Sequence, residues 1–424
     1  MKYKTEAFDI WYNLCQISYE PLVRCRLDFE GRLDPDVLTQ AVTLSMRTIP
    51  LIGCCFDDSA NRPRWVEKGF TGKDMVRVYE ADNDVDKQIA NLLFSSIDFA
   101  REPQVKIFLV RRADGDTLCA VISHLVCDAA GFKQYLYLLS ELYTVLKNDK
   151  PVPAYPFHPR GTRALFTDIK LLEKMRLLCF GYSEVFDPIE KEQPDVSFGK
   201  SNPEPYKETR KIAKEDFARL KSFAKAHGAT VNDSMMALYA RAFCVHTGTK
   251  KVTVPSSIDL RRFISPGVNY GITNYSSNCL CHISFGSDDS LVDTLQQISE
   301  QMQRHKATNS ILQAVLTWEL AVRFLPYFFL KRIFSRFLTG VQLVFTNLGI
   351  LEQSLLCFDN LPIKNAYLTA ATTPMPFLLL NASTYDDCCT LSCSFYGSDR
   401  AEKWVNALLD HMCAEIEALE QTRE

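Results

Sequence analysis

The chain has 424 residues, of which 47% are hydrophobic and 23% charged, with a formal net charge of −3. This length allows two domains with a large core, and the mixed charge excludes the basic footprint of a nucleic-acid-binding protein. Residues 1–16 contain no apolar segment typical of a signal peptide, so we expect a cytoplasmic protein. None of the 15 cysteines forms a CxxC pair and their number is odd, which favours reduced core thiols over a disulfide framework.

The first half of the chain alternates strand and helix patterns. Asp34 and Pro35 mark a helix start, and the apolar face of this helix continues to Met46. The turn-like segment 113–116 separates two apolar runs, which predicts a hairpin of strands at 105–110 and 117–122. Further strands are expected at 19–29 and 51–56, and further helices at 84–93 and 160–185.

A segment rich in Pro, Glu, Asp and Lys, at 186–206, divides the chain. We therefore expect a first lobe at 1–185, a linker at 186–205 and a second lobe at 206–424. In the second lobe the patterns predict helices at 214–227, 231–246 and 291–305, and a last helix opened by Asp399. Strands are expected at 206–212, 251–258, 278–285 and 342–345, followed by an antiparallel run at 363–371, 377–384 and 389–396.

Residues 311–338 are strongly apolar, but charged side chains and Pro326 interrupt them. No run of about 18 uncharged apolar residues remains, which argues against a transmembrane helix. We expect two core helices here, or helices that line a channel. Contact between this region and a membrane surface is a minor alternative, because its basic residues can sit at lipid headgroups.

The most informative stretch follows the second strand of the predicted hairpin. Apolar residues at 132–146 have the spacing of one helix face, and Asp128 stands where its carboxylate can accept from first-turn amides. His124 therefore lies at a strand end, where an imidazole held in one tautomer can act as a general base. Gly131 lets the helix pack close to neighbouring backbone. On spacing alone, the alternative is a strand-to-helix loop with a capping Asp and a core histidine.

The segment HLVCDAAGF, with the spacing His124-x3-Asp128-x2-Gly131, resembles the HxxxDG signature of the condensation-domain and chloramphenicol-acetyltransferase-like superfamily of acyltransferases. Three further pieces resemble this family in order and spacing: residues 31–38 followed by 49–51, the "DLR" segment at 259–262, and the "SNLG"-like strand end at 345–349. The family's Gly after the Asp is Ala129 here, and its effect on activity is left open. The first His of the HHxxxDG form is Ser123, which favours acyl transfer by a stand-alone enzyme over amide formation inside a synthetase.

The resemblance implies an α/β fold with mixed sheets, in which two chloramphenicol-acetyltransferase-like lobes enclose an active-site tunnel at their interface. It implies that His124 takes the proton from an acceptor hydroxyl or amine as that group attacks a thioester carbonyl. The motif's second member, Asp128, points away from the tunnel and pairs with an Arg. Arg261 matches this Arg by its place in the DLR segment, and Arg262 is the alternative.

Other residues could serve the substrates. Developing negative charge on the carbonyl oxygen needs a donor, and the candidates are the loop amide near Gly131 and the tunnel-lining Thr346 and Asn347, which resemble the family's strand-end motif. Asn274 and Asn278 could contact a pantetheine arm, with a polar turn as the alternative. The histidines at 246, 282, 305 and 411 lack metal-ligand spacing, so no metal and no tightly bound cofactor is expected.

The sequence thus predicts an acyltransferase that moves an acyl group from a thioester to a small-molecule alcohol or amine. Coenzyme A is the favoured carrier of the acyl group. The alternatives are a stand-alone condensation protein that uses the phosphopantetheine of an acyl carrier protein, and a catalytically silent family member that only binds. The apolar region at 311–338 favours a medium or long apolar substrate, but the sequence does not specify the acyl chain or the acceptor.

Overall fold

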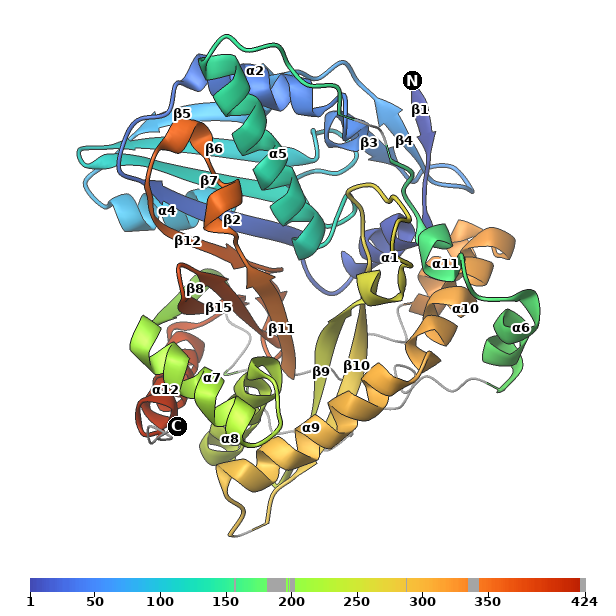
Figure 1. The fold of residues 1–424 in the computed structure, drawn as a ribbon, viewed down its shortest axis with the longest axis vertical. Coiled ribbons are helices and arrows are strands. Elements are labelled where there is room, and N and C mark those ends of the chain that lie inside the picture. The colour runs from blue at the N-terminus through green and yellow to red at the C-terminus, as the bar shows by residue number, and fades with distance from the viewer. Residues whose placement is uncertain are drawn as a thin grey trace.

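The computed structural model describes residues 1–155, 158–180, 196, 198, 203–286, 288–334 and 343–419. The described chain forms two lobes, each built on a mixed sheet (Figure 1). Each lobe has its own cluster of buried apolar side chains. The site described below lies where the two lobes meet.

The first lobe contains a five-stranded sheet in the order β12-β2-β7-β6-β5. Helices α2 and α5 pack against each other on one face of this sheet (Figure 1), and α4 packs against β7. The central strand β7 is buried along its whole length, which explains its continuous apolar run. The elements are β2 (Leu22–Phe29), α2 (Pro35–Ser45), α3 (Gly72–Met75), β5 (Val76–Glu80), α4 (Val85–Leu93), β6 (Val105–Arg112), β7 (Gly115–Ser123), α5 (Ala129–Lys147) and β12 (Ile363–Thr369).

The second lobe contains a seven-stranded sheet in the order β10-β9-β11-β14-β15-β13, with β8 paired to β15. Four helices cover it, and α8 packs between α9 and α12. The elements are β8 (Glu204–Ile212), α7 (Lys214–Ala226), α8 (Val231–Thr247), β9 (Lys251–Asp259), β10 (Ser276–Ser284), α9 (Leu291–Ala307), β11 (Leu343–Ile350), β13 (Thr373–Pro374), β14 (Leu378–Tyr385), β15 (Cys388–Gly397) and α12 (Asp399–Glu417).

A third group of elements lies at one side of both lobes, on the right in Figure 1. Helix α10 contacts α1, α6 and α11, and a small sheet in the order β1-β4-β3 lies above them. The elements are β1 (Lys2–Lys4), α1 (Ala7–Cys15), β3 (Cys54–Asp57), β4 (Arg64–Glu67), α6 (Leu171–Phe180), α10 (Ser310–Phe324) and α11 (Tyr327–Phe334). Short 3-10 turns span Pro50–Gly53, Thr162–Phe166, Leu260–Phe263, Gln353–Leu355 and Phe358–Asn360.

Most of the predicted elements are present, and local signals explain their ends. Asp34 caps α2 by accepting from two first-turn amides, and Gly248 ends α8 with a φ of 73°. The predicted strand at 51–56 is wrong in its first half, where Pro50 opens a 3-10 turn before β3. The predicted helix at 160–185 is a 3-10 turn followed by α6, and its end at 181–185 lies outside the described residues.

The prediction of a three-stranded antiparallel run near the C-terminus is also only partly correct. Strands β14 and β15 form such a hairpin, and its turn residues Asp386 and Asp387 have positive φ angles of 46° and 57°. Strand β12, in contrast, pairs with β2 in the other lobe, with Leu368 opposite Cys25. A strand from the second half of the sequence therefore completes the sheet of the first lobe. The predicted linker, 186–205, lies almost entirely outside the described residues.

The described chain shows three further features that bear on function. All 15 cysteines are free thiols, and eleven of them are buried. No group of His, Cys, Asp and Glu side chains among the described residues is arranged to hold a metal ion. None of the described helices combines the length and the apolar character that crossing a membrane requires.

Candidate active site

The loop between β7 and α5 carries the predicted base. Backbone hydrogen bonds fix this loop, since the His124 amide donates to the Pro21 carbonyl at 2.9 Å and the Val126 amide to Ser123 at 3.0 Å. The side chains at 125–127 are fully buried. With its neighbours anchored in the core, His124 is left to line a cavity between the lobes.

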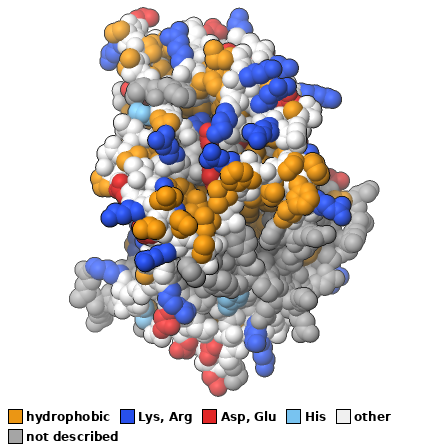
Figure 2. Space-filling view, turned by 90° about the vertical axis from the view of Figure 1, so that its right-hand side faces the viewer, with side chains coloured by type: hydrophobic (Ala, Val, Ile, Leu, Met, Phe, Trp, Pro, Cys, Tyr) orange, Lys and Arg blue, Asp and Glu red, His pale blue; other side chains and the backbone are white. Residues whose placement is uncertain are grey.

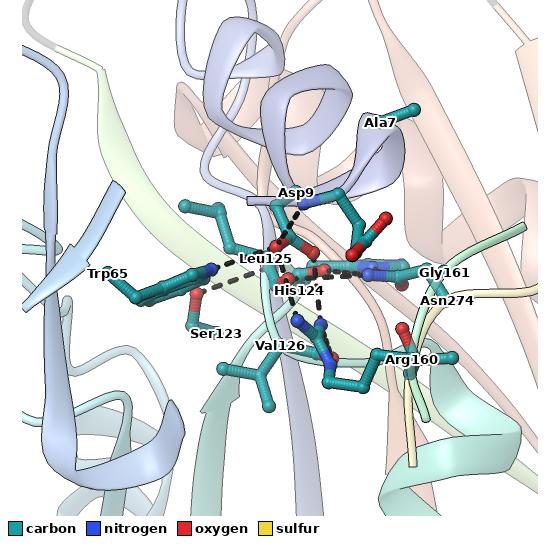
Figure 3. Close-up of polar contacts among 12 residues, drawn as sticks. Ala7, Asp9, Trp65, Ser123, His124, Leu125, Val126, Arg160, Gly161 and Asn274 are labelled. Carbon is teal, nitrogen blue, oxygen red and sulfur yellow. Dashed lines mark hydrogen bonds and ion pairs between the residues drawn. The ribbon is translucent and has the colours of Figure 1, made fainter. Parts of the chain in front are cut away.

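Hydrogen bonds with Asn274 define the tautomer of His124. The Asn274 side-chain amide donates to the His124 carbonyl at 2.9 Å, so its oxygen faces the ring and lies 3.0 Å from Nδ1 (Figure 3). Because that oxygen can only accept, Nδ1 carries the proton and Nε2 keeps a lone pair. The Tyr12 ring stacks on one face of the imidazole with a centroid separation of 3.7 Å and restricts its rotation.

The protonation state of His124 fits a base. Burial lowers the pKa of the imidazole, and the opposing effects of Asp128 and Asn274 are too small to restore it. The ring is therefore neutral at pH 7 and can accept a proton at Nε2.

Asp128 is the N-cap of α5 and is almost fully buried. Its carboxylate accepts from the Gly131 amide at 2.8 Å and from the Tyr275 amide at 2.7 Å. The Arg261 guanidinium donates to both of its oxygens, at 2.9 and 3.0 Å. Arg262, the alternative partner, instead donates to the Lys306 carbonyl at 2.9 Å.

This arrangement makes Asp128 a bridge between the lobes, with both of its carboxylate oxygens engaged by protein donors. Burial alone would raise the pKa of the Asp128 carboxyl, but the Arg261 charge and two backbone amides outweigh it and hold that pKa below its usual value. The charge-assisted pair joins the start of α5 to the end of β9. Its effect is to fix the loop that aims His124.

The cavity has a volume of about 600 Å³ and is lined by both lobes. One wall is aromatic, where Trp11 packs edge-to-face on Trp318 and Phe334 with centroid separations of 5.2 and 4.8 Å. Another part of the lining is polar and includes the β11 residues Thr346 and Asn347. A cavity of this composition can hold an extended molecule with an apolar and a polar part.

The structure brings most of the predicted site residues together but changes two of the expected roles. Asn278 lines the cavity, whereas Asn274 is fully buried and holds His124, so it does not contact a pantetheine arm. The Gly131 amide is engaged by Asp128 and is therefore not a donor for a substrate oxygen. A side chain at Gly131 would place its Cβ 2.8 Å from that of Cys127, in line with the predicted close packing.

A second group of contacts that fixes the loop between β7 and α5 was not predicted from the sequence. Arg160 donates to the Val126 carbonyl at 2.8 Å and to both oxygens of Asp9, at 3.2 and 3.0 Å (Figure 3). The Trp65 indole completes the cluster by donating to Asp9 at 2.8 Å. No local spacing signals this cluster, because its members are about 150 residues apart at the extremes.

The fold is that of known acyl-transfer and condensation proteins. Solved structures with similar folds include polyketide synthase associated protein 5 from Mycobacterium tuberculosis, at 15% identity and a TM-score of 0.69, covering 99% of this chain and 98% of that one. The trichothecene 15-O-acetyltransferase from Fusarium sporotrichioides is 13% identical with a TM-score of 0.70, and the match covers 97% of this chain and 94% of that one. The first condensation domain of the calcium-dependent antibiotic synthetase is 14% identical with a TM-score of 0.67, and the match covers 99% of this chain and 97% of that one.

The two lobes, each built on a mixed sheet, give the chain the fold of the condensation-domain and chloramphenicol-acetyltransferase-like superfamily, which is the fold that its sequence motifs predict. Within this superfamily, residues 204–354 match the family of phthiocerol/phthiodiolone dimycocerosyl transferase C-termini. No curated protein sequence matches the chain.

Proposed function

We propose that this protein is an acyltransferase that uses His124 as general base to move an acyl group from a thioester to a hydroxyl or amine. The observation that carries the proposal is the fixed tautomer of His124 in the cavity between the lobes. A ring with its proton on Nδ1 presents a basic Nε2 and nothing else to a substrate. The transferase names of the matching family and of one similar structure support the same reaction class.

The reaction needs one proton relay. As the acceptor oxygen or nitrogen bonds to the thioester carbonyl carbon, its proton passes to Nε2 of His124. Collapse of the tetrahedral intermediate breaks the carbon–sulfur bond, and the leaving thiolate takes the proton from the imidazolium. A positioned base of this kind contributes about 10²–10⁴-fold, and the activated thioester makes an enzyme nucleophile unnecessary. We assign the stabilisation of the oxyanion to Thr346 and Asn347, which line the same cavity.

Coenzyme A is the carrier that we favour. Lys133 lines the cavity beside β11 and donates to the Ile350 carbonyl at 3.0 Å, so it places a cation where a phosphate of the donor could approach. The aromatic wall formed by Trp11, Trp318 and Phe334 favours a medium or long apolar acyl chain. Since all 15 cysteines are free thiols, we propose a reducing compartment, the cytoplasm.

Two other functions remain candidates for specific reasons. Similarity to the first condensation domain of an antibiotic synthetase keeps an acyl carrier protein as an alternative donor. Ala129, which replaces the family's Gly beside Asp128, keeps a catalytically silent binding protein as the other.

A thiol-release assay tests the proposal. Purified protein is screened with acyl-CoA thioesters of increasing chain length against panels of alcohols and amines. We expect His124→Ala to lower kcat/KM by about 10²–10⁴-fold at unchanged thermal stability. His227→Ala, a substitution of an exposed histidine at the end of α7, serves as the matched control and leaves the rate unchanged.

The outcomes separate the three functions. Release of free thiol from acyl-CoA that depends on His124 supports the proposal. Turnover only with an acylated carrier protein supports the condensation alternative. Ligand binding without turnover, equal in wild type and His124→Ala, supports the silent alternative. Full activity of a folded His124→Ala variant contradicts the mechanism.

A further inference from the structure

Helices α6, α10 and α11 carry many of the exposed apolar side chains of the described residues. Of the fourteen large apolar side chains that are exposed among the described residues, seven lie on α6 or in the α10–α11 region, and these include every exposed phenylalanine. Phe324 is 73% and Phe328 67% exposed. We call this region the α6–α10–α11 surface; it is formed by Leu171, Leu172, Met175, Phe324, Phe328 and Phe329.

The three helices form one continuous face. Helix α10 packs against α6 on one side and α11 on the other. Figure 2, which views the molecule from the side of these helices, shows hydrophobic side chains gathered across the middle of this face with lysines and arginines around them. An exposed apolar patch on this scale, with a polar rim, marks a contact surface.

The core does not require these phenylalanines. Helix α11 already buries Tyr327, Leu330 and Phe334 on its inner face, while Phe328 and Phe329 point to the opposite side. The expectation of two core helices in this region is confirmed for their inner faces, whereas their outer faces are exposed. The alternative expectation, that they line a channel, holds for their inner faces, because Trp318 and Phe334 line the cavity that contains His124.

The charge of this surface is opposite to that of the chain as a whole. Segments 170–176 and 316–334 carry six basic and two acidic side chains, a formal charge of +4 in a protein of net −3, and Asp58, outside these segments, pairs with Lys331 at 2.9 Å. Of the two acids, Glu319 accepts from the Thr162 hydroxyl at 2.7 Å. Arg323 lies over the Phe324 ring at 5.7 Å, so cation and apolar ring are neighbours at the tip of α10.

We propose that the α6–α10–α11 surface docks on an anionic lipid bilayer. Phenylalanines at a helix tip enter the boundary between headgroups and acyl chains, and surrounding lysines and arginines bind lipid phosphates. Because none of the described helices is suited to cross a membrane, the contact is peripheral. A second copy of this chain is a poorer occupant, since pairing two such faces would bring two charges of +4 together.

Docking in this way has a consequence that rests on the proposed function. Two of the helices on the bilayer, α10 and α11, also wall the cavity, so a membrane-dissolved acyl acceptor or donor would meet the protein next to its active site. The substrate class is then a lipid or lipid-like alcohol. The docking itself does not depend on catalysis and is tested without it.

Vesicle co-sedimentation of the full chain tests the docking. Vesicles of phosphatidylcholine alone are compared with vesicles that contain about one quarter phosphatidylglycerol, at about 0.1 M salt. We expect binding to the anionic vesicles that weakens at least about tenfold when the anionic lipid is omitted or the salt is raised to about 0.5 M.

Two pairs of variants locate the contact. Phe324→Ser combined with Phe328→Ser should weaken binding at least about tenfold, whereas Val245→Ser, at a 63% exposed position on α8, should not. Arg176→Glu combined with Arg323→Glu should weaken binding by a similar factor, and Lys225→Glu on α7 should not. All four replace exposed side chains, so the fold is preserved.

The failure of this proposal is distinguishable from that of the proposed function. His124→Ala should bind vesicles as the wild type does, whatever its activity. Equal binding by the wild type and the double phenylalanine variant, or equal binding to both kinds of vesicle, would overturn the proposal. A concentration-dependent dimer that the phenylalanine variant abolishes, without vesicle binding, would assign the surface to a second copy instead.

Discussion

Each lobe contains a strand that leads into a 19-residue helix, and the two junctions differ in what they do. In the first lobe, β7 is the second strand of a hairpin and leads to α5. In the second lobe, β15 is the second strand of a hairpin and leads to α12. The second junction is a single residue, Ser398, which caps α12 by accepting from the Ala401 amide. The first junction has five residues, from His124 to Asp128.

The two junctions share a helix cap but differ in the charge of the cap residue and in the length of the loop. Both helices need a capping acceptor, and both have one. At the surface of the second lobe a serine is sufficient. At the interface, the cap is a carboxylate whose charge also binds Arg261 of the other lobe, and the added residues carry His124 into the cavity. Helix capping is thus shared, whereas the charge and the loop length are specific to the site.

The largest expected effect on the free energy of unfolding comes from removing the two helix caps, Asp128 and Ser398, one at a time. Asp128→Ala removes one partner of a buried ion pair and should lower the free energy of unfolding by about 3–5 kcal/mol, because Arg261 is left uncompensated. Ser398→Ala removes only a cap and should cost about 0.5–2 kcal/mol. Urea denaturation of both variants at pH 7 measures the two costs. Equal costs would show that the Asp128 charge adds nothing to capping.

A double-mutant cycle sharpens the same point. Arg261→Met alone should be nearly as destabilising as Asp128→Ala, and the two together less than the sum of both, since neither charge is then left alone. Arg262→Met is the matched control and should change stability by less than about 0.5 kcal/mol, because this exposed side chain donates to a carbonyl and lies over the Phe263 ring but has no ion pair with a buried carboxylate. Additive single effects would contradict the assigned pair.

The next effect concerns how His124 is held. Asn274→Asp places a negative charge 3.0 Å from Nδ1 in place of a neutral acceptor, which favours the imidazolium and raises the His124 pKa. Since burial keeps that pKa low in the wild type, the acidic limb of the kcat/KM profile should move to higher pH, with roughly tenfold lower activity on that limb. Asn278→Asp, in the cavity lining but without a contact to His124, is the control. An acidic limb of the kcat/KM profile that stays at the same pH in Asn274→Asp would contradict the role of Asn274.

What could be predicted from the sequence is local or carried by a motif. The capping position of Asp128 and the helix after it follow from spacing, and the pairing of Asp128 with Arg261 follows from the family resemblance. The hold of Asn274 on His124 spans 150 residues and has no local signal. The residue type indicated a polar side chain but not its partner, so the contact between Asn274 and His124 was not predicted.

Two further errors have a common physical cause. Apolar patterns indicate that a segment is buried but not against what. Strand β12 was therefore assigned to its neighbours in sequence when it pairs with β2, and the exposure of Phe328 and Phe329 on the outer face of α11 was not predicted. In both cases the decisive contact, or its absence, lies in tertiary structure.

The smallest expected effect concerns a second contact between the lobes, outside the cavity lining. Lys207 on β8 donates to the Tyr367 hydroxyl on β12 at 2.8 Å, and no carboxylate among the described residues forms an ion pair with it as Asp128 does with Arg261. Burial lowers the pKa of Lys207 to about 7, whereas an unfolded lysine titrates near about 10.4. Between these pH values the unfolded state binds more protons, so this group makes the free energy of unfolding rise with pH.

Lys207→Met removes that dependence. Relative to the variant, the wild type should gain at least about 1 kcal/mol in the free energy of unfolding between pH 7 and pH 9.5, because other titrating groups cancel in the difference. Urea denaturation at both pH values measures the gain, and Lys211→Met, an exposed substitution on the same strand, should show none. A difference that stays constant with pH would mean that Lys207 remains charged at this contact. The Asp128–Arg261 and Lys207–Tyr367 contacts would then both contain charged side chains. Only the charge at Asp128 would be balanced by an opposite charge.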